Sequence, residues 1–316
     1  MKDRIPTVAM IFAAGRGQRM QPLSDVLPKP ALPVPGGPVV SWGFRLAVHS
    51  GITDVVLNSW WLADTMEQTA TEATPPGVDL HFSRETDLMD TAGGLALARD
   101  RGLLGNRGPV LVINGDGILN LDLEPLFDRH QETDDLVTLG LLPHLGPERW
   151  SRVVLDRNDR VRGLLPPGVP ESGEIPFLYP GVMLIAREAL ETLETTVSGV
   201  APALWGPCIA QERLGGALVS GHWREVGTPA DFLNHTLALL GDRCDIHASA
   251  HVHDDAVLKH SLIGTGATIE RAVVIGKSII SHGAVIGAGA RILRSIVLGD
   301  VQISAGETVT DDIRTG

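Results

Sequence analysis

The segment Val8-Ala-Met-Ile-Phe-Ala-Ala-Gly-Arg-Gly17 starts as a continuous apolar run and ends in a turn that contains two glycines. A short apolar run bounded by glycine is typical of a strand that is buried on both faces. Up to about residue 240, similar runs alternate with stretches whose apolar residues have helical spacing. This alternation predicts an α/β domain with a mainly parallel sheet between helices, in which ligands bind at the carboxyl ends of the strands.

The apolar pattern also gives approximate positions for the elements of this domain. Strands are predicted at 8–14, 54–58, 80–82, 110–113, 136–142, 152–155 and 177–185, helices at 39–50, 62–71 and 93–101, and a loop at 166–173. These elements place the first domain at residues 1–242.

From Ile246 onward the sequence becomes a repeat in which aliphatic residues recur every six positions. The series runs through Ile246 and Val252, then Val257, Ile263, Ile269 and Ile275, then Ile286, Ile292 and Leu298. Such a series resembles the hexapeptide repeat of a left-handed parallel β-helix, in which three hexads complete one coil and the aliphatic residues stack inside. An ordinary antiparallel domain would show a period of two. We therefore expect a short β-helix at residues 243–316, and a homo-oligomer formed through it because an open stack of coils leaves edges to cover.

Composition excludes several classes of protein. The chain has 316 residues, 26 of them basic and 38 acidic, and its net charge of −12 argues against a nucleic-acid surface or a polybasic membrane patch. Cys208 and Cys244 cannot form a disulfide framework and lack the spacing of a zinc site. No apolar run approaches the ~20 residues of a membrane-spanning helix. We expect a cytoplasmic protein without membrane or nucleic-acid partners.

The glycine turn after the first strand has the features of a phosphate-binding loop. Glycine lets backbone N–H groups approach a phosphate closely because it has no Cβ. Met20 stands where a dinucleotide fingerprint has its third glycine, and no Gly-Lys-Ser/Thr of a P-loop follows. Arg19 and the Pro28-Lys29-Pro30 segment supply cations instead, and Lys29 is the only lysine between residues 3 and 258. An ammonium group is a compact point charge that arginine does not duplicate.

Residues 13–30 resemble the signature of the sugar-nucleotide pyrophosphorylases, which are sugar-1-phosphate nucleotidylyltransferases: Gly-x-Gly-x-Arg-Met-x-Pro-Leu-(Ser/Thr) followed by Pro-Lys-Pro. The resemblance implies a Rossmann-like catalytic domain. It implies that Arg19 and Lys29 are catalytic, with Lys29 on the α-phosphate. It further implies nucleotide contacts from Ala13, Ala14, Gly15, Gly17 and Gln18.

Two carboxylates correspond to metal ligands of that family. Asp116 follows the apolar run Val112-Ile-Asn-Gly, and the resemblance implies that it binds Mg²⁺, which prefers hard oxygen ligands. The second ligand falls in the segment Trp223-Arg-Glu-Val-Gly-Thr228, where Glu225 stands in place of the usual aspartate. His251-x-His253 also has metal-compatible proximity, but turn histidines explain it better.

The segment from Glu85 to Arg99 resembles the base-reading loop and following helix of the family. Its sequence is closest to that of the mannose-1-phosphate guanylyltransferases. The resemblance implies that Glu85 accepts hydrogen bonds from guanine and that Gly93 contacts the nucleotide. Other segments, such as Asn58-Ser-Trp-Trp-Leu62, resemble N-acetylmuramate-1-phosphate uridylyltransferase. The identity of the base therefore stays open.

The residues expected to bind the sugar 1-phosphate depart from the family pattern, because no Glu-Lys-Pro occurs between Leu136 and Gly181. An arginine or the metal must then hold the sugar phosphate, and Arg224 is our candidate, with Arg152 and Arg162 as alternatives. The remaining sugar-binding residues implied by the resemblance are Asn114, Tyr179, Gly181 and Thr228.

The resemblance implies a Mg²⁺-dependent enzyme that converts an NTP and a sugar 1-phosphate into an NDP-sugar and pyrophosphate. GTP with mannose 1-phosphate is the first expectation, and UTP or dTTP with N-acetylmuramate, glucose or N-acetylglucosamine 1-phosphate is the alternative. Glu225 and the missing Glu-Lys-Pro leave a further alternative, a non-catalytic regulatory subunit that binds nucleotide sugars.

Overall fold

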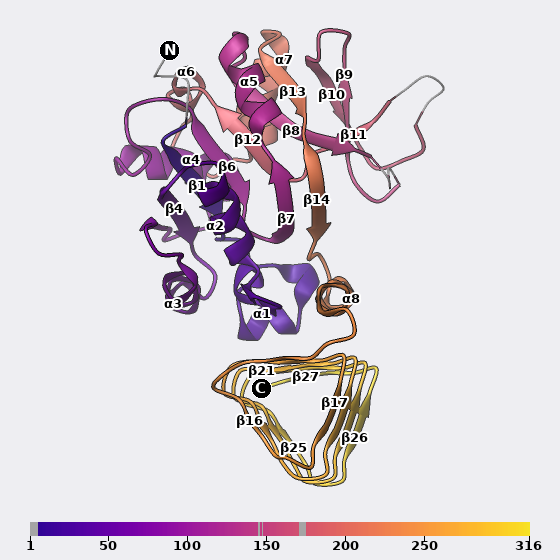
Figure 1. The fold of residues 1–316 in the computed structure, drawn as a ribbon. Helices are drawn as coiled ribbons and strands as arrows, with labels where there is room; N and C mark the ends of the chain where they lie inside the picture. Colours follow the sequence, from indigo (N-terminus) through magenta and orange to yellow (C-terminus); the bar gives the residue numbers. More distant parts are fainter. Residues whose placement is uncertain (1–5, 145, 147, 171–174) are drawn as a thin grey trace. The chain divides into compact units, whose positions relative to one another are not determined.

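The computed structural model describes residues 6–144, 146, 148–170 and 175–316 of the chain (Figure 1). The chain divides into two compact units, each of which collects segments that are distant in sequence. One unit contains Met1–Gly15 and Val40–Arg224, and the other contains Arg16–Val39 and Glu225–Gly316. The segment between Gly15 and Val40 thus belongs with the C-terminal part of the chain. The domain boundary between residues 242 and 243 stays a prediction.

The first unit is built on a mixed β-sheet. Its parallel part has the order β6-β1-β4-β5, formed by β1 (Val8–Phe12), β4 (Asp54–Ser59), β5 (Asp79–Arg84) and β6 (Val110–Asn114). Beyond β6 the order continues β12-β8-β11-β9-β10 through antiparallel pairs, and β13 joins β8 in parallel. The bounds are β8 Val137–Pro143, β9 Arg152–Leu155, β10 Val161–Leu165, β11 Phe177–Leu178, β12 Val182–Ile185 and β13 Leu214–Leu218. The predicted α/β sheet is confirmed, and it carries an antiparallel extension.

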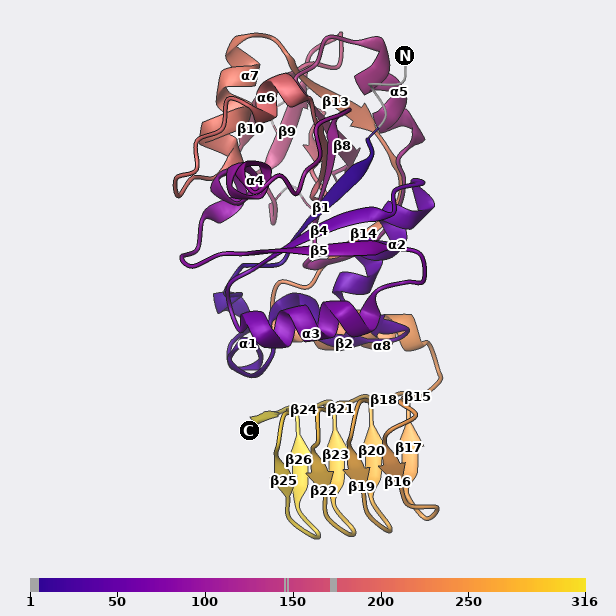
Figure 2. The same ribbon diagram turned by 90° about the vertical axis from the view of Figure 1, so that its left-hand side faces the viewer.

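Helices pack on both faces of the parallel strands (Figure 2). Val8 and Met10 of β1 belong to a core cluster with residues of α4, whereas a Cβ on Gly43 of α2 would lie 3.2 Å from Cδ1 of Ile11. Successive strand residues point to opposite faces, so β1 needs an apolar side chain at every position. The helices are α2 Val40–His49, α3 Ala63–Ala73, α4 Asp90–Asp100, α5 Glu124–Glu132, α6 Arg187–Leu190, the π-helix η4 Ala201–Trp205 and α7 Gly206–Ala210. A separate two-stranded sheet pairs β7 (Gly117–Asp122) with β14 (Ser220–Glu225).

The single strand predicted at 177–185 is wrong, because the chain breaks it into β11 and β12. The break is at Gly181, whose φ of 88° lies in the left-handed region that favours glycine. A Cβ there would also stand 2.7 Å from the side chain of Asn114. Of the loop predicted at 166–173, residues 171–173 lie outside the described residues, and 166–170 are irregular.

The second unit begins with short elements: η2 Gln18–Met20, α1 Leu23–Val26, η3 Lys29–Ala31, β2 Pro33–Val34 and β3 Gly37–Pro38. Helix α8 (Pro229–Leu240) leads into the C-terminal strands β15 to β27. Their bounds are Asp245–Ile246, His251–Val252, Val257–Lys259, Leu262–Ile263, Thr268–Ile269, Val274–Gly276, Ile279–Ser281, Val285–Ile286, Arg291–Leu293, Ile296–Leu298, Gln302–Ile303, Thr308–Thr310 and Ile313–Thr315. In the described part of the chain, no helix is both long and apolar enough to cross a membrane.

The C-terminal strands form three parallel sheets around a triangular core, which confirms the predicted β-helix (Figure 1). One coil takes 17 residues, because Ile246 pairs with Ile263 and Ile263 with Ile280. Two sides of each coil have six residues and the third has five. The hexad register was therefore wrong at two points: Leu258 and Val297 point into the core where Val257 and Leu298 were expected. A shortened side shifts the pattern by one residue in each coil.

The five-residue side turns at a column of non-glycine residues with left-handed φ. His260, Lys277, Arg294 and Asp311 occupy this position in successive coils, with φ between 45° and 52°. Each of the first three is followed by a buried serine whose hydroxyl accepts a backbone N–H from the next coil: Ser278 donates to Ser261, and Ser295 to Ser278, both at 3.1 Å. The serine ladder satisfies buried N–H groups that the sharp turn leaves without strand partners.

The outer face of the sheet β15-β18-β21-β24-β27 is covered within the second unit. Leu262, Ile279 and Ile296 alternate with the inward residues of this sheet, and all three are buried. A Cβ on Gly299 would lie 3.0 Å from Cγ1 of Val26, and Nε2 of His260 donates to the carbonyl of Leu237 at 2.9 Å. The β-helix therefore packs on both the 16–39 segment and α8.

Replacing Ser278 by alanine tests the ladder. Ser278→Ala leaves the buried N–H of Ser295 without its acceptor, which should lower the free energy of unfolding by about 1–3 kcal/mol. Ser304→Ala is the matched control, since Ser304 is an exposed serine of the same β-helix. Urea unfolding followed by circular dichroism measures both. Equal, near-zero effects of the two substitutions would contradict a stabilising ladder.

Candidate active site

The carboxyl end of β1 carries the residues expected to face the nucleoside. Ala13 and Ala14 are buried, and the N–H of Ala13 donates to Oδ1 of Asn58 at 2.8 Å. The carbonyl of Ala14 accepts from the N–H of Trp61 at 3.4 Å. Gly15 is exposed, and a Cβ there would meet nothing within 4 Å. Of these three residues, Gly15 offers the open backbone that a ligand could approach.

Glu85, the expected reader of the base, lies beneath the surface. Its side chain is buried, with 4% exposure, and both carboxylate oxygens accept hydrogen bonds from the protein. Asn58 Nδ2 donates to Oε1 at 2.8 Å, and the N–H of Met89 donates to Oε2 at 2.9 Å. Burial raises the pKa of Glu85, an effect that these two hydrogen bonds oppose. The carboxylate therefore serves internal donors in this structure.

Gly93 packs against the segment that follows α6. Its N–H donates to the carbonyl of Ser198 at 3.1 Å, and a Cβ at this position would lie 2.3 Å from the carbonyl oxygen of Thr196. Ser198 also donates to the carbonyl of Met89, and Val200 donates to the hydroxyl of Thr91. This close approach explains why the position needs glycine, and a nucleotide contact from Gly93 stays a prediction.

The carboxyl end of β6 brings together residues expected near the metal and the sugar. The N–H of Asn114 donates to the carbonyl of Gly181 at 2.8 Å, and that of Gly115 donates to the carbonyl of Phe12 at 2.9 Å. Asp116 follows directly and is half-buried. The ring of Tyr179 packs edge-on against Trp205 of η4, with centroids 5.1 Å apart, and burial raises the pKa of its hydroxyl. Asn114 and Gly181 therefore meet, as their shared predicted role requires.

Among the three candidate cations for the sugar phosphate, Arg162 and Arg224 are exposed to solvent and Arg152 is buried. Arg162 is engaged by Asp156 and Glu212 at 2.7 and 2.9 Å, and Arg152 is buried with its Nε donating to the carbonyl of Pro166. Arg224 is exposed and follows Trp223, whose indole nitrogen would lie 3.1 Å from a Cβ on Gly117, the residue after Asp116. These contacts favour Arg224.

In the second unit, the glycine turn and the lysine predicted to bind phosphates lie against each other. Gly17 has a φ of 65°, and a Cβ there would stand 3.4 Å from Cβ of Lys29. Lys29 is buried, with 7% exposure, while Gln18 and Arg19 are exposed on η2 and Met20 anchors that turn in the core. Position 17 therefore favours glycine for two reasons. Its backbone is left-handed, and the side chain of Lys29 lies close to where a Cβ would stand.

Glu225 contacts Arg19. Nη2 of Arg19 lies 2.7 Å from Oε1 of Glu225, in a pair whose side chains are 68% and 17% exposed. The Glu225 carboxylate folds over Gly227, where a Cβ would lie 3.0 Å from Cδ. Thr228, an expected sugar ligand, caps α8: its hydroxyl accepts from the N–H of Asp231 at 3.1 Å and donates to the Asp231 carboxylate at 2.9 Å. A sugar contact from Thr228 stays a prediction.

Within the described residues, no group of three or more His, Cys, Asp or Glu side chains could hold a metal by itself. Asp116 offers a half-buried carboxylate that suits a hard cation whose other ligands are phosphate oxygens and water. Glu225 fits less well, since Arg19 already occupies one of its oxygens. A metal site at Asp116 would therefore depend on the substrate to complete it.

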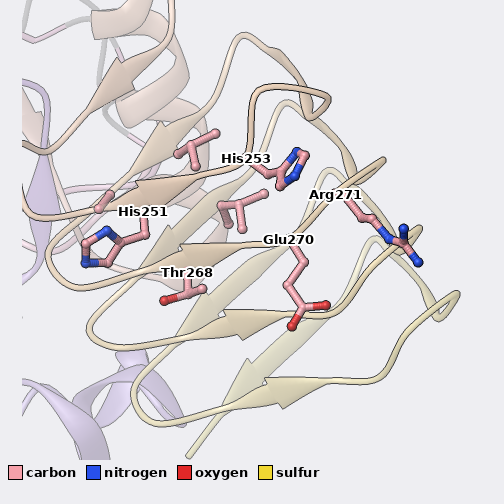
Figure 3. A pocket seen from close by; sticks show the side chains of 8 residues that line it. His251, His253, Thr268, Glu270 and Arg271 are labelled. Atoms are coloured by element: carbon pink, nitrogen blue, oxygen red, sulfur yellow. The ribbon is translucent and has the colours of Figure 1, made fainter.

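A shallow depression on the β-helix is lined by residues 250–253 and 268–271 (Figure 3). Figure 3 shows His251 and His253 pointing away from each other, which does not suit a shared metal ion. Nδ1 of His253 accepts from the N–H of Asp255 at 3.1 Å, and Oε2 of Glu270 accepts from the N–H of Ala288 at 2.8 Å. His253 therefore stabilises a turn of its own coil, and Glu270 stabilises a turn of the next coil.

The comparison with protein families agrees with this geometry. The nucleotidyl transferase family model matches residues 8–241. The chain belongs to the nucleotidyl transferase family. N-acetylmuramate α-1-phosphate uridylyltransferase of Neisseria meningitidis serogroup B is 35% identical to it over 227 residues, which are 70% of this chain and 93% of the relative.

Two further relatives are mannose-1-phosphate guanylyltransferases. That of Mycobacterium tuberculosis is 28% identical over 298 residues, which cover 87% of this chain and 80% of the relative. The catalytic subunit beta of Drosophila melanogaster is 27% identical over 228 residues, 72% of this chain and 61% of the relative. Similarity to the mycobacterial protein covers more of this nucleotidyltransferase than similarity to the other two.

Sequence reasoning missed the role of Asn58. Both Asn58 and Asn114 pair in register with Phe12, so a polar residue ends each strand beside β1. A polar residue at the end of an apolar run was a usable signal. The partners of Asn58 could not be identified from the sequence, because Ala13 and Glu85 are 45 and 27 residues away from it.

Proposed function

We propose that this nucleotidyltransferase transfers a nucleotidyl group from an NTP to a sugar 1-phosphate, which yields an NDP-sugar and pyrophosphate. The observation that carries the proposal is the glycine turn at Gly17 packed on the buried Lys29, with Arg19 exposed on the same turn. The named activities of the relatives support it, since each transfers a uridylyl or guanylyl group to a sugar 1-phosphate.

The chemistry needs no nucleophilic side chain. An oxygen of the sugar phosphate attacks the α-phosphorus of the NTP, and the bond from that phosphorus to the bridging oxygen of the β-phosphate breaks. Pyrophosphate leaves with the electron pair, so charge and atoms balance without an external acid or base. The attacking phosphate is already ionised near neutral pH, and catalysis consists of positioning and charge neutralisation.

Lys29 and Arg19 supply the fixed positive charge. Lys29 is held rigidly by its burial, and a preorganised cation stabilises charge that develops at the α-phosphate. Arg19 is exposed, and its guanidinium keeps further N–H groups for phosphate oxygens beside the one that faces Glu225. In a protein of net charge −12, such local cations must attract the anionic substrate.

The family generally uses a divalent metal ion, and we propose that Mg²⁺ serves here, with Asp116 as its protein ligand. When bound, Mg²⁺ neutralises phosphate charge and polarises the phosphoryl group. Glu225 holds Arg19 in the structure, so its part in metal binding stays a prediction.

Two substrate pairs are supported by different observations. UTP with N-acetylmuramate 1-phosphate is favoured by the 35% identity to the Neisseria protein, which extends over 93% of that relative. GTP with mannose 1-phosphate is favoured by the mycobacterial relative, whose similarity continues into the β-helix. The carboxylate of Glu85 is buried with both oxygens on internal donors, which does not favour the guanine contact expected from the sequence, and we place the uridylyl reaction first.

A grid of substrates tests the proposal. Pyrophosphate release should occur with Mg²⁺ for one combination of GTP, UTP, dTTP, CTP or ATP with the 1-phosphates of mannose, glucose, N-acetylglucosamine or N-acetylmuramate. The same wells should release no pyrophosphate when EDTA is added. No turnover in any well, combined with a rise in melting temperature on adding nucleotide sugars, would indicate the regulatory subunit instead.

Substitution of Lys29 tests its catalytic role. Lys29→Met keeps the apolar stem that lies on Gly17 and removes the charge, so kcat should fall by about 100-fold or more while the fold is retained. Lys277→Met, at an exposed lysine of the β-helix, is the control and should leave kcat unchanged. A Lys29→Met variant with near-normal kcat would remove Lys29 from the mechanism.

We also propose a cytoplasmic homo-oligomer. The two cysteines lack a disulfide framework, which suits a reducing compartment. Assembly through the β-helix would use the outer faces of the sheets β16-β19-β22-β25 and β17-β20-β23-β26, since the third outer face is buried within the chain. Light scattering should give a mass of at least two chains, and a monomer at all concentrations would count against the proposal.

A further inference from the structure

The ends of three neighbouring strands are joined to α4 by a continuous series of hydrogen bonds, here called the Asn58–Glu85 relay. Ala13 donates its N–H to Oδ1 of Asn58 at 2.8 Å, Asn58 donates through Nδ2 to Oε1 of Glu85 at 2.8 Å, and Met89 donates its N–H to Oε2 of Glu85 at 2.9 Å. The relay starts after β1, passes the ends of β4 and β5, and ends at the residue before α4.

The relay is shielded from solvent. Ala13, Asn58 and Glu85 are 2%, 3% and 4% exposed, and buried polar groups require partners because water is excluded. Gly94 of α4 closes one side: a Cβ there would lie 2.9 Å from Oε1 of Glu85 and 3.2 Å from Nδ2 of Asn58. The lack of a side chain at Gly94 therefore makes room for the Asn58–Glu85 contact.

In each hydrogen bond of the relay, only one of the two groups can be the donor. Ala13 and Met89 present backbone N–H groups, which are donors only, so Asn58 must turn its oxygen to Ala13 and its amide nitrogen to Glu85. Glu85 then accepts on both oxygens, an arrangement that suits an ionised carboxylate because that form has acceptor sites only. The relay thus fixes the amide orientation of Asn58 and favours the carboxylate form of Glu85.

We propose that Glu85 is a positioning residue for the NTP: it acts through Asn58 on the backbone at Ala13 and through Met89 on the start of α4, and it does not read the base. This inference rests on the proposed function, in which an NTP is the substrate. A base-reading carboxylate must present oxygens to the ligand, whereas both oxygens of Glu85 face internal donors in a buried side chain. Its contribution should therefore be equal for all nucleobases.

Swapping the donor and the acceptor gives a decisive test. Glu85→Gln alone places an NH₂ group against either Nδ2 of Asn58 or the N–H of Met89, and Asn58→Asp alone places two acceptors together. In the double variant Asn58→Asp/Glu85→Gln, the aspartate accepts from both Ala13 and the glutamine NH₂, while the glutamine oxygen accepts from Met89. All three hydrogen bonds are restored although the negative charge has moved.

We expect each single variant to raise the KM for the NTP, and to lower kcat/KM, by about 10-fold, the factor that corresponds to one broken buried hydrogen bond. The KM for the sugar 1-phosphate should stay unchanged. The double variant should return to within about threefold of the wild-type value. The order of preference among GTP, UTP, dTTP, CTP and ATP should be the same in all four proteins.

The opposite results overturn the inference. A double variant no better than the worse single variant would contradict the relay, and a changed order of preference among the NTPs would show that Glu85 contacts the base. If both single variants fail to fold, a folded double variant with unchanged base preference supports the relay, and an unfolded one contradicts it. Should wild type turn over no substrate pair, the proposed function fails, and the rescue is then measured on the melting temperatures alone.

Discussion

The carboxyl edge of the parallel strands imposes the constraint on which the site depends. Each strand that ends there leaves backbone N–H groups without a neighbouring strand, and such groups are costly when buried unpaired. The chain pairs them locally: Ala13 donates to the side chain of Asn58, Asn114 to the carbonyl of Gly181, and Gly115 to the carbonyl of Phe12. The backbone around the candidate site is thereby fixed without any ligand, and Gly15 is left open.

Charge is handled in two different ways in this acidic protein. The proposed phosphate site has one buried lysine and one exposed arginine, whose partner Glu225 lowers the net charge of the turn. The buried carboxylate of Glu85 has two N–H donors in place of water. A buried charge is tolerable only when hydrogen bonds replace its hydration. Burial raises the pKa of Glu85, and its two hydrogen bonds oppose that rise.

The sequence predicted the parts whose information is local. The glycine turn, the apolar strands and the inward aliphatic residues of the β-helix each depend on residues a few positions apart. The structure agrees with these predictions except at the strand 177–185 and at the inward positions Leu258 and Val297. The length of the coil could not be predicted in this way, because a five-residue side depends on left-handed φ values at His260 and Lys277, which are not glycines. The relay was also hidden, since it joins Ala13, Asn58 and Glu85 across large sequence separations. A resemblance supplied a role for Glu85, and only the structure showed that both its oxygens accept hydrogen bonds from within the protein.

The β-helix also packs against other segments of its own unit. The 16–39 segment that carries Arg19 and Lys29 packs in the same unit as the coils, through Val26 against Gly299, and α8 contributes the Leu237 carbonyl to His260. The outer side chains Leu262, Ile279 and Ile296 are buried there, which removes apolar surface from water and stabilises this packing. A cation stabilises a developing charge best when its position is fixed in advance, so this support from the coils would contribute to the catalytic role proposed for Lys29. The β-helix and the glycine turn at Gly17 therefore belong to one structural unit.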